Sequence, residues 1–283
     1  MAAKRALQAR ADPLMRLRAG ARGCYSFSFN FSNGKRMPER ASSSEVLSER
    51  LAEVRRRIEQ AARRTNRAPG EIRLVGVSKT QPTELLKLAL EAGLQDFGEN
   101  RVQEADAKIA AVGRNDARWH LIGHLQANKA RRAVVLFDLI HSLDSISLAR
   151  RLDRLCIEEG RGELPVLIQV DLAGEATKTG VSEEELPLMV EAVRETERLR
   201  LRGLMTLPPF FEEAERVRPF FKRLRELRDA LSAGEAFGAN SSGELSMGMS
   251  HDFEIAIEEG ATLVRVGTAI FGERRARETS TGQ

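Results

Sequence analysis

The residue whose position in this sequence points most directly to covalent chemistry is Lys79. It follows the apolar, strand-like run 74–77 and precedes a segment with a helical pattern. At the carboxyl end of a buried parallel strand, apolar surroundings disfavour the ammonium form, so the free amine that attacks aldehydes becomes available. We therefore expect Lys79 to bind an aldehyde covalently, with pyridoxal phosphate as the electrophile. The alternative is a strand-end lysine that points into water.

A second group of residues, near the end of the chain, could bind an anion. The segment 246–250 leads into a helix that we expect to begin near His251, and Ser250 then takes an N-cap-like position. Free amides and the helix dipole favour an anion there. Gly267 would let the backbone approach closely, and Thr268 adds a hydroxyl donor. Singly, these residues could be an ordinary cap and a packing glycine; together they predict a phosphate site.

The elements that must position these residues begin at Ser44. Leu47, Leu51, Val54 and Ile58 recur at the spacing of a helix that buries one face. After this helix, strand-like and amphipathic helical segments alternate. The expected strands are 72–79, 96–100, 118–123, 139–144, 165–172, 200–207, 244–249 and 263–271.

Eight such units predict an α/β fold, a single (β/α)8 TIM-type barrel preceded by an N-terminal helix. Two Rossmann-like halves would also alternate, but no G-x-G-x-x-G motif opens a helix after a strand. Functional groups of a barrel gather at the carboxyl ends of its strands, and phosphate commonly lies by the last two. Lys79, Asn100, the segment 246–250 and residues 265–268 should therefore meet at one mouth.

Charge is distributed unevenly along the 283 residues. Residues 1–37 hold eight Lys/Arg and one acid, a net of +7, and subtracting this from the +4 of the whole chain leaves −3 for the remainder. The sequence pI of about 9.3 thus belongs to the N-terminal arm, and we expect no nucleic-acid partner. No apolar run approaches the roughly 18 residues that span a bilayer, so we expect no membrane association.

Three domains are expected: an N-terminal extension at 1–43, the barrel at 44–273 and a C-terminal tail at 274–283. The extension is rich in Arg, Ser and Gly and lacks sustained periodicity. It could be a transit peptide, a disordered arm, or upstream sequence before a true start at Met37. Cys24 and Cys156 lie far apart without metal or redox spacing, which fits a reducing, cytoplasmic setting.

Several longer segments of this sequence match motifs of a known family, in the same order. They are VSKT (77–80), FGEN (97–100) with VQE (102–104), WHLIGHLQANK (119–129), KTG (178–180), RGLMTLP (202–208), SMGMSHDFEIAI (246–257) and VRVGTAIFG (264–272). From about Ser44 to Gly272 the chain resembles the pyridoxal phosphate homeostasis proteins, single-barrel relatives of the alanine racemase N-terminal domain. Such proteins usually lack an arm like the one found here.

The resemblance implies a set of residues that bind pyridoxal 5'-phosphate. Lys79 would carry the cofactor as an internal aldimine, and Ser250, Gly267 and Thr268 would surround the phosphate. The other cofactor-binding residues are expected to be Asn100, Ser246, Met247 and Arg265.

Arg265 is the residue that would set the electronic character of the cofactor, because the resemblance to racemase-type barrels places an arginine beside the pyridine nitrogen. A permanent guanidinium cannot accept the ring proton and opposes its addition, so the electron sink is weakened. The alternative is an arginine paired with a barrel carboxylate for structure.

The chief functional rival is a weak amino-acid racemase, which needs two bases on opposite faces of the substrate carbon. In racemases the second base is a tyrosine from another domain of the partner chain. The single tyrosine here is Tyr25, in the extension, and eleven residues follow Gly272. We therefore expect no enzyme, but a carrier or regulator of pyridoxal phosphate and of amino and keto acids.

The remaining expectations concern partners and metals. Pyridoxal-phosphate-dependent apoenzymes are candidate recipients, and the chain could be a monomer or a weak dimer. His120 and His124 are four residues apart, which on a strand is roughly 13 Å, too far to share an ion. A strand that ends between them would leave the geometry open, but we expect no metal. Cys156 lies in a helical run and is interpreted as a buried small residue.

Overall fold

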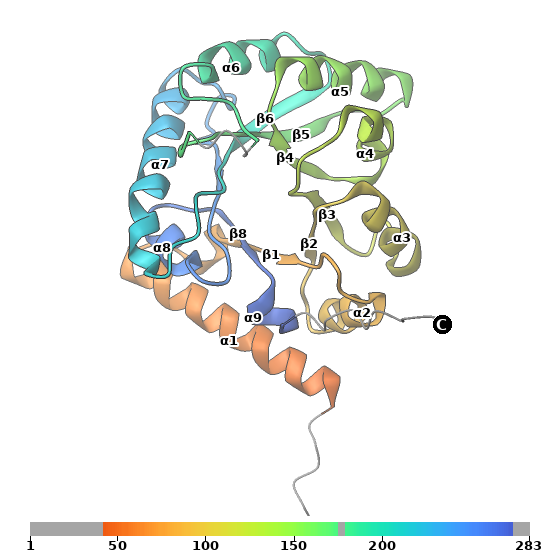
Figure 1. Ribbon diagram of the computed structural model, residues 1–283, viewed down its shortest axis with the longest axis vertical. Helices are drawn as coiled ribbons and strands as arrows, with labels where there is room; N and C mark the ends of the chain where they lie inside the picture. The colour runs from red at the N-terminus through yellow and green to blue at the C-terminus, as the bar shows by residue number, and fades with distance from the viewer. Residues whose placement is uncertain (1–41, 175–178, 274–283) are drawn as a thin grey trace, which may run out of the picture. The chain divides into compact units, whose positions relative to one another are not determined.

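Eight parallel strands form a closed barrel in the computed structural model, which describes residues 42–174 and 179–273. Each strand pairs with its sequence neighbours, and β8 pairs with β1 to close the sheet. Figure 1 shows the helices as an outer ring around these strands. The strands are β1 (Arg73–Val77), β2 (Asp96–Glu99), β3 (Arg118–Leu121), β4 (Leu139–Leu143), β5 (Leu164–Gln169), β6 (Leu199–Met205), β7 (Glu244–Ser246) and β8 (Leu263–Val266). The predicted (β/α)8 barrel is confirmed.

Helices follow the strands around the barrel and also precede the first one. They are α1 (Ser43–Arg64), α2 (Thr83–Glu91), α3 (Val102–Val112), α4 (Ala130–Leu136), α5 (Ile146–Glu158), α6 (Leu186–Arg194), α7 (Arg218–Ala233), α8 (Phe253–Glu258) and α9 (Thr268–Phe271). Short 3-10 turns are η1 (Pro69–Glu71), η2 (Ala127–Lys129) and η3 (Ala214–Val217). None of these helices combines the length and apolar character needed to cross a bilayer, within the ranges described.

Helix α1 is the predicted N-terminal helix, and its sequence explains where it starts. Ser42 and Glu45 form a capping box: the Ser42 amide donates to the Glu45 carboxylate at 2.7 Å, and the Glu45 amide donates to the Ser42 hydroxyl at 3.2 Å. Leu51 and Val54, each 1% exposed, belong to the buried face. This face packs against α8, α9 and α2, so α1 belongs to the barrel domain.

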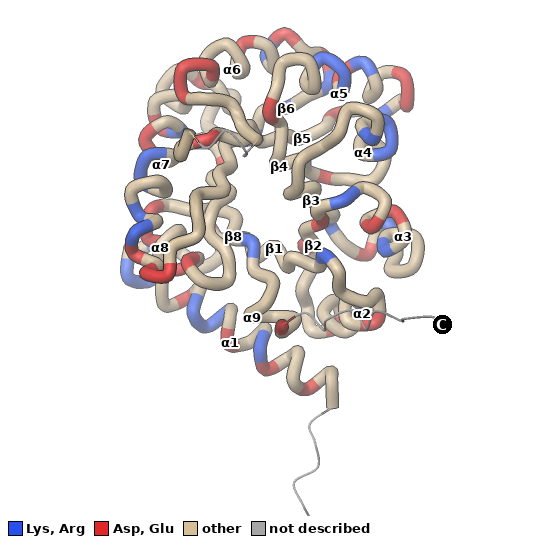
Figure 2. Tube along the Cα trace, in the orientation of Figure 1, with Lys and Arg blue, Asp and Glu red and all other residues tan. Residues whose placement is uncertain are grey.

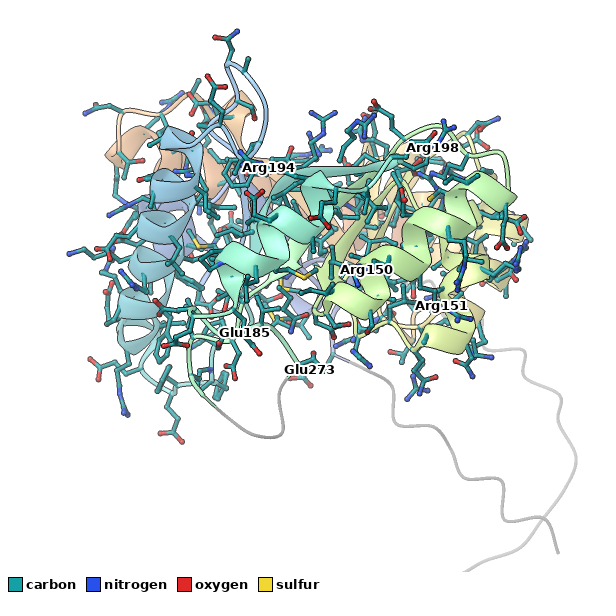
Figure 3. All side chains as sticks on the ribbon, turned by 90° about the horizontal axis from the view of Figure 1, so that it is seen from above. Arg150, Arg151, Glu185, Arg194, Arg198 and Glu273 are labelled. Atoms are coloured by element: carbon teal, nitrogen blue, oxygen red, sulfur yellow. The ribbon has the colours of Figure 1, made fainter. Side chains whose placement is uncertain are left out.

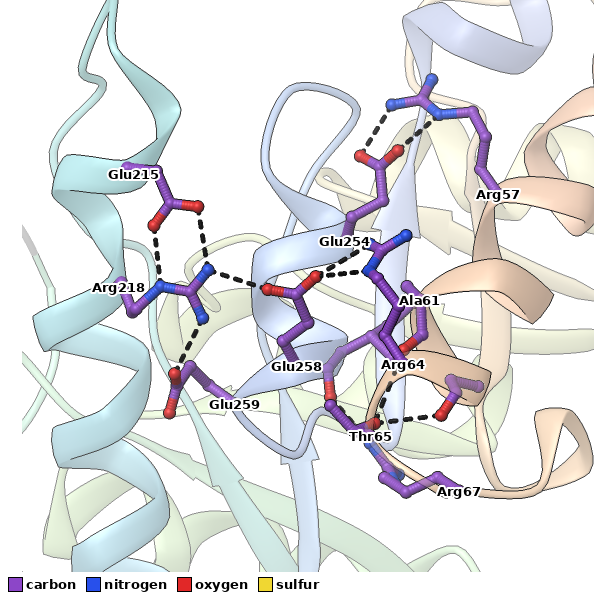
Figure 4. Close-up of polar contacts among 12 residues, drawn as sticks. Arg57, Ala61, Arg64, Thr65, Arg67, Glu215, Arg218, Glu254, Glu258 and Glu259 are labelled. Atoms are coloured by element: carbon purple, nitrogen blue, oxygen red, sulfur yellow. Dashed lines mark hydrogen bonds and ion pairs between the residues drawn. The ribbon is translucent and has the colours of Figure 1, made fainter.

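Ion pairs fasten α1 to α8, and α8 in turn to α7 (Figure 4). The Arg57 guanidinium binds Glu254 through two hydrogen bonds of 2.7 Å. Glu258 accepts from Arg64 at 2.9 Å and from Arg218 at 2.8 Å. Bidentate and shared ion pairs of this kind fix the relative orientation of the helices more firmly than single exposed pairs do. They fix α8, the helix that follows the segment 246–250.

Strand alternation divides the side chains into two layers. Outward-facing residues join the large apolar cluster between strands and helices, which includes Phe97 and Trp119. Inside the barrel, a smaller apolar cluster contains Val75, Leu139, Leu167, Met205 and Leu263. The rest of the interior contains buried polar groups. The sheet thus separates an apolar outer layer from an interior that mixes apolar and polar side chains.

The structure corrects several predicted boundaries. All eight strands exist, but the predicted strands 72–79 and 263–271 were too long, because β1 ends at Val77 and β8 at Val266. Residues 268–271 form α9, so the placement of Gly267 and Thr268 on the eighth strand was wrong. At the carboxyl ends the chain leaves the ladder to form loops, and apolar residues there continue into loop or helix. Most of the predicted extension (1–41) and the tail (274–283) lie outside the described residues.

Charged residues lie mainly on the outer helices and loops, as Figure 2 shows, and the strands carry fewer. Figure 3 shows the barrel from the side, with Glu185 and Glu273 along one edge and Arg194 and Arg198 along the opposite edge. Glu185 lies between β5 and α6, whereas Arg198 immediately precedes β6. The edge with Glu185 and Glu273 is therefore the carboxyl-end face of the barrel, and we call it the mouth.

Candidate functional site

Lys79 lies in the turn between β1 and α2, two residues beyond the end of the strand, and its side chain is partly exposed. The next residue, Thr80, has φ of +65°. A β-branched residue in this left-handed region is an outlier that persists only where its surroundings impose it. The turn that carries Lys79 is therefore held in a strained conformation at the mouth.

Buried charges behind this turn supply the restraint. The Lys108 ammonium donates to the Ser78 carbonyl at 2.6 Å, and Glu104 accepts the Thr80 amide at 2.5 Å. Lys108 also binds Glu104 and Glu99, at 2.6 and 2.7 Å. The two peptide groups that flank Lys79 are thus both tied to α3. Sequence reasoning missed this role of Lys108, although a lysine on the buried face of a predicted helix was a visible signal.

The pKa values of the two carboxylates of this cluster, Glu99 and Glu104, are shifted in opposite directions. Burial raises the pKa of Glu99 in spite of its contacts with Lys108 and Ser78. For Glu104, burial alone would raise the pKa, but hydrogen bonds from Lys108 and the Thr80 amide outweigh it and lower the pKa. Glu104 therefore stays ionised and keeps its hold on the turn.

Ser250 and Gly267 meet at the mouth, as predicted, but with a different geometry. Helix α8 begins at Phe253 with Asp252 as its N-cap residue, so the expected helix start near His251 and the capping role of Ser250 there were wrong. The Ser250 hydroxyl instead accepts the amides of Gly267 at 3.1 Å and Ala269 at 3.4 Å. The Asp252 side chain accepts the Met249 amide at 2.6 Å and closes the β7–α8 loop.

Gly248 is the glycine that this loop most strongly requires. Its φ is +89°, and a Cβ there would lie 2.5 Å from the Ala256 side chain and 2.9 Å from the Phe253 backbone. At Gly267 a Cβ would meet Val77 at 3.3 Å, a tighter approach than most but not a clash. The predicted close approach at Gly267 therefore exists, and Gly248 adds a stricter one that the sequence analysis did not single out.

Arg265 lies inside the barrel with 1% of its surface exposed. Its guanidinium donates to the Ser246 hydroxyl at 2.5 Å and to the Thr206 carbonyl at 2.9 Å. No carboxylate of the described residues forms an ion pair with it, which removes the alternative of a structural pair. Burial lowers the pKa of Arg265 to about 10, and Asp252 only partly offsets this. The mouth therefore has a buried positive charge bound to neutral acceptors.

The structure places two further predicted residues, Asn100 and Met247, in different surroundings. Asn100 follows β2 and is partly exposed at the rim, where it also borders a cavity of about 1870 Å³ between α1, α2, α3 and α9. Met247 is fully buried in the outer apolar cluster. Because Ser246 faces the interior, alternation turns Met247 toward the helices. Only its backbone can border the mouth.

The residues that the sequence analysis set aside have separate roles. His120 is buried inside the barrel, whereas His124 is exposed and binds Asp144 at 2.8 Å, so the two do not share a site. Burial raises the pKa of Cys156 to about 11, which suppresses the thiolate, in line with a packed small residue. No cluster of three or more possible metal ligands occurs in the part of the chain that the structure describes.

The donor set at the mouth fits a phosphorylated aldehyde. Lys79 offers an amine, Ser250 and Thr268 offer hydroxyls, and the amides of Gly267 and Ala269 lie beside them. Gly248 lets its loop pack closely against Phe253 and Ala256 of α8. Within the ranges that the structure describes, the buried guanidinium of Arg265 forms no ion pair with a carboxylate. Hydroxyls, amides and a cation bind anions, and an amine on a strained turn can bond to a carbonyl carbon.

Comparison with known proteins gives consistent matches. Residues 50–275 match the family described as "Alanine racemase, N-terminal domain". The chain is 45% identical over 227 residues to the pyridoxal phosphate homeostasis protein of Aquifex aeolicus, covering 80% of this chain and 98% of that protein. It is 43% identical over 229 residues to the protein of the same name from Pseudomonas aeruginosa, covering 81% and 96%.

A solved structure shows the same likeness. The chain resembles PipY of Synechococcus elongatus PCC7942, whose structure is described as having PLP bound. The TM-score is 0.67 at 38% identity, and the match covers 80% of this chain and 100% of that one.

Proposed function

This chain belongs to the pyridoxal phosphate homeostasis protein family, and from that premise we propose that it binds pyridoxal 5'-phosphate covalently through Lys79 and takes part in the homeostasis of this cofactor. The observation that carries the proposal is the position of Lys79. It lies on a strained turn at the mouth of the barrel, where the segment that contains Ser250 and the residues after β8 also meet. We further propose that the protein acts in the cytoplasm.

Each residue of the site has a task in this proposal. Lys79 would hold the aldehyde carbon, with Lys108 and Glu104 keeping its turn in place. The hydroxyls of Ser250 and Thr268 and the neighbouring backbone amides would bind the phosphate. Asn100 and Ser246 would border the ring. Arg265 would lie toward the ring nitrogen, where its positive charge opposes protonation.

The bound group supplies an aldehyde that captures amines and a ring that withdraws electrons from them. Arg265 would weaken that withdrawal, because its burial among neutral acceptors leaves a net positive charge at the nitrogen. This supports a carrier of the cofactor, which influences the supply of vitamin B6 aldehyde and of amino and keto acids, with little catalytic turnover. Pyridoxal-phosphate-dependent apoenzymes are the proposed recipients, and a monomer or weak dimer is the proposed state.

The alternative is a weak amino-acid racemase. The tyrosine that could serve as a second base, Tyr25, lies outside the described residues. Steady-state assays of the purified, cofactor-loaded protein over a panel of L- and D-amino acids would decide. We expect no racemisation above the rate of free pyridoxal phosphate. Sustained turnover that disappears in Lys79→Ala but persists in Lys87→Ala, an exposed lysine of α2, would favour the enzyme.

A further inference from the structure

A line of buried hydrogen bonds crosses the barrel interior from its amino-terminal end to Arg265. We call Asp96, His120, His141, Ser246 and Arg265 the interior relay. Asp96 Oδ1 lies 2.9 Å from His120 Nε2, and His120 Nδ1 lies 2.9 Å from His141 Nε2. His141 Nδ1 lies 2.8 Å from the Ser246 hydroxyl, which accepts from Arg265. All five residues are at least 96% buried.

The donor at one end of the relay and the acceptor at the other determine in which direction its hydrogen bonds point. Arg265 can only donate, so the Ser246 oxygen is an acceptor for it. At the other end Asp96 is an acceptor: burial alone would raise its pKa, but hydrogen bonds from Arg118 and His120 outweigh this and lower the pKa to about 2. Burial above all, together with the positive charge of Arg265, holds the pKa of His141 well below its ordinary value, so this ring is neutral.

One proton assignment then satisfies every atom of the relay. The Ser246 hydroxyl donates to His141 Nδ1, His141 Nε2–H donates to His120 Nδ1, and His120 Nε2–H donates to Asp96. Both rings are neutral and carry their proton on Nε2. The reverse direction between Ser246 and His120 requires a charged His120 and leaves the Ser246 proton without an acceptor in the relay. Since buried polar groups are costly to leave unmatched, the first assignment is favoured.

The relay leads to Arg265, the group that would lie toward the ring nitrogen of the cofactor. The Ser246 oxygen becomes a stronger acceptor when its own proton is donated to His141, because hydrogen bonds in series polarise one another. It therefore holds the Arg265 guanidinium more firmly. The other charged groups that act on the relay are Arg73 on β1, Arg118 on β3 and Asp252 before α8. Asp138, before β4, acts on Arg118.

We propose that Asp96, His120, His141 and Ser246 are positioning residues that act through Arg265, and that their one-way hydrogen bonding fixes the guanidinium against the cofactor's ring. Only the second part of this inference, the effect of the relay on the bound cofactor, rests on the proposed function. The orientation of the relay is a property of the protein without cofactor.

Nitrogen-15 NMR of the histidine rings in the cofactor-free protein tests the orientation. The chain has four histidines, and His124 and His251 are exposed references. We expect His120 and His141 to be neutral and protonated on Nε2 at pH 7, with the signals of His124 and His251 serving as exposed rings for comparison. A His141 ring protonated on Nδ1, or a charged ring at either buried position at pH 7, would overturn the inference.

The effect on the cofactor is tested by Asp96→Asn, with Asp144→Asn as the matched control. Asp144 makes the same kind of contact with His124 outside the relay. Asp96→Asn lets the relay reverse, so we expect the Nδ1-protonated form of His141 to appear and the visible absorption band of the bound cofactor to shift. Asp144→Asn should change the His124 signals and leave the band in place.

Ser246→Ala provides a second measurement that keeps the inference falsifiable if Asp96→Asn unfolds. It removes an acceptor from a charged donor, and we expect cofactor release to become faster by on the order of tenfold. If the parent binds cofactor and both variants leave band and release unchanged, the relay does not act through Arg265. If the parent binds no cofactor while the NMR orientation holds, the proposed function fails and the orientation of the relay stands.

Discussion

At the scale of single residues, the mouth of this barrel holds two kinds of contact that can be separated by mutation. Lys79 offers a covalent bond, whereas Ser250 and Thr268 offer hydrogen bonds to an anion. The Ser250 hydroxyl also accepts hydrogen bonds from two backbone amides, those of Gly267 and Ala269. Loss of this hydroxyl would therefore disturb several donors at once.

The phosphate contacts give the first prediction. The double variant Ser250→Ala, Thr268→Ala keeps Lys79 but removes two hydroxyls, each worth about 1.5–3 kcal/mol to a charged acceptor. We expect covalent binding to persist and cofactor release during dialysis to become faster. Ser242→Ala, an exposed serine in the loop before β7, is the control. A double variant that retains the cofactor as long as the parent would show that the phosphate lies elsewhere.

The second prediction concerns pH and Asp96. Its pKa in the folded protein, about 2, lies below its ordinary value of 3.8. The ionised carboxylate therefore stabilises the fold above about pH 3.8, by about 2 kcal/mol, and this contribution disappears as the pH falls toward 2. Urea unfolding of the parent and of Asp96→Asn should show a stability difference at pH 6 that shrinks by pH 2.5. A difference that is the same at both pH values would contradict this.

At the scale of elements, α1 acts as a part of the barrel domain. Its buried face and the pairs of Arg57 and Arg64 with α8 join it to the segment that follows β7. Helix α8 in turn packs Phe253 and Ala256 against Gly248. The helix that precedes the barrel thus supports a loop of the mouth.

The third prediction tests this support. Leu51 is 1% exposed on α1, and Leu51→Ala removes buried methyl groups and leaves a cavity. We expect a loss of about 2–5 kcal/mol in the free energy of unfolding. Arg56→Ala, which removes an exposed pair with Glu53 on the same helix, should cost less than about 1 kcal/mol. Equal effects in urea unfolding would mean that the α1 face is not a packed core.

The elements also show which features the sequence could reveal. The alternation of apolar, strand-like segments with amphipathic helical segments located every strand, because the buried face of each element requires apolar residues at regular positions. Strand ends were too long, since apolar residues such as Ile270 and Phe271 are buried whether they lie in a strand or in a helix. The amine and hydroxyls of the mouth followed from strand order. The interior relay did not, because its contacts join residues from five strands and depend on the tilt of the barrel.

At the scale of the whole molecule, the N-terminal extension and the barrel differ in composition. The first 37 residues carry a net +7, and the remainder carries −3. The capping box of Ser42 and Glu45 lies after these 37 residues and defines the start of α1. The folded domain therefore has its own N-terminal boundary.

The fourth prediction follows from that boundary. Removal of residues 1–36 should shift the melting temperature by less than about 2 °C, because roughly 1 kcal/mol corresponds to about 2–4 °C for a domain of this size. Cofactor binding should be unchanged. Removal of residues 1–50, which deletes the capping box and Leu47, is the contrasting variant and should lower the melting temperature clearly. A marked loss in the shorter truncation would make the extension part of the fold.

The central claim is that Lys79 bonds to pyridoxal phosphate, and reduction with borohydride followed by peptide mapping tests it most directly. The loaded protein should absorb near 420 nm, on the order of other lysine-bound forms of the cofactor. After reduction, we expect the adduct on the peptide that contains Lys79, in the parent and in Lys87→Ala. Lys79→Ala should yield no adduct but retain weakened, non-covalent binding of the phosphorylated aldehyde. An adduct on any other lysine of the parent, or none, would contradict the account.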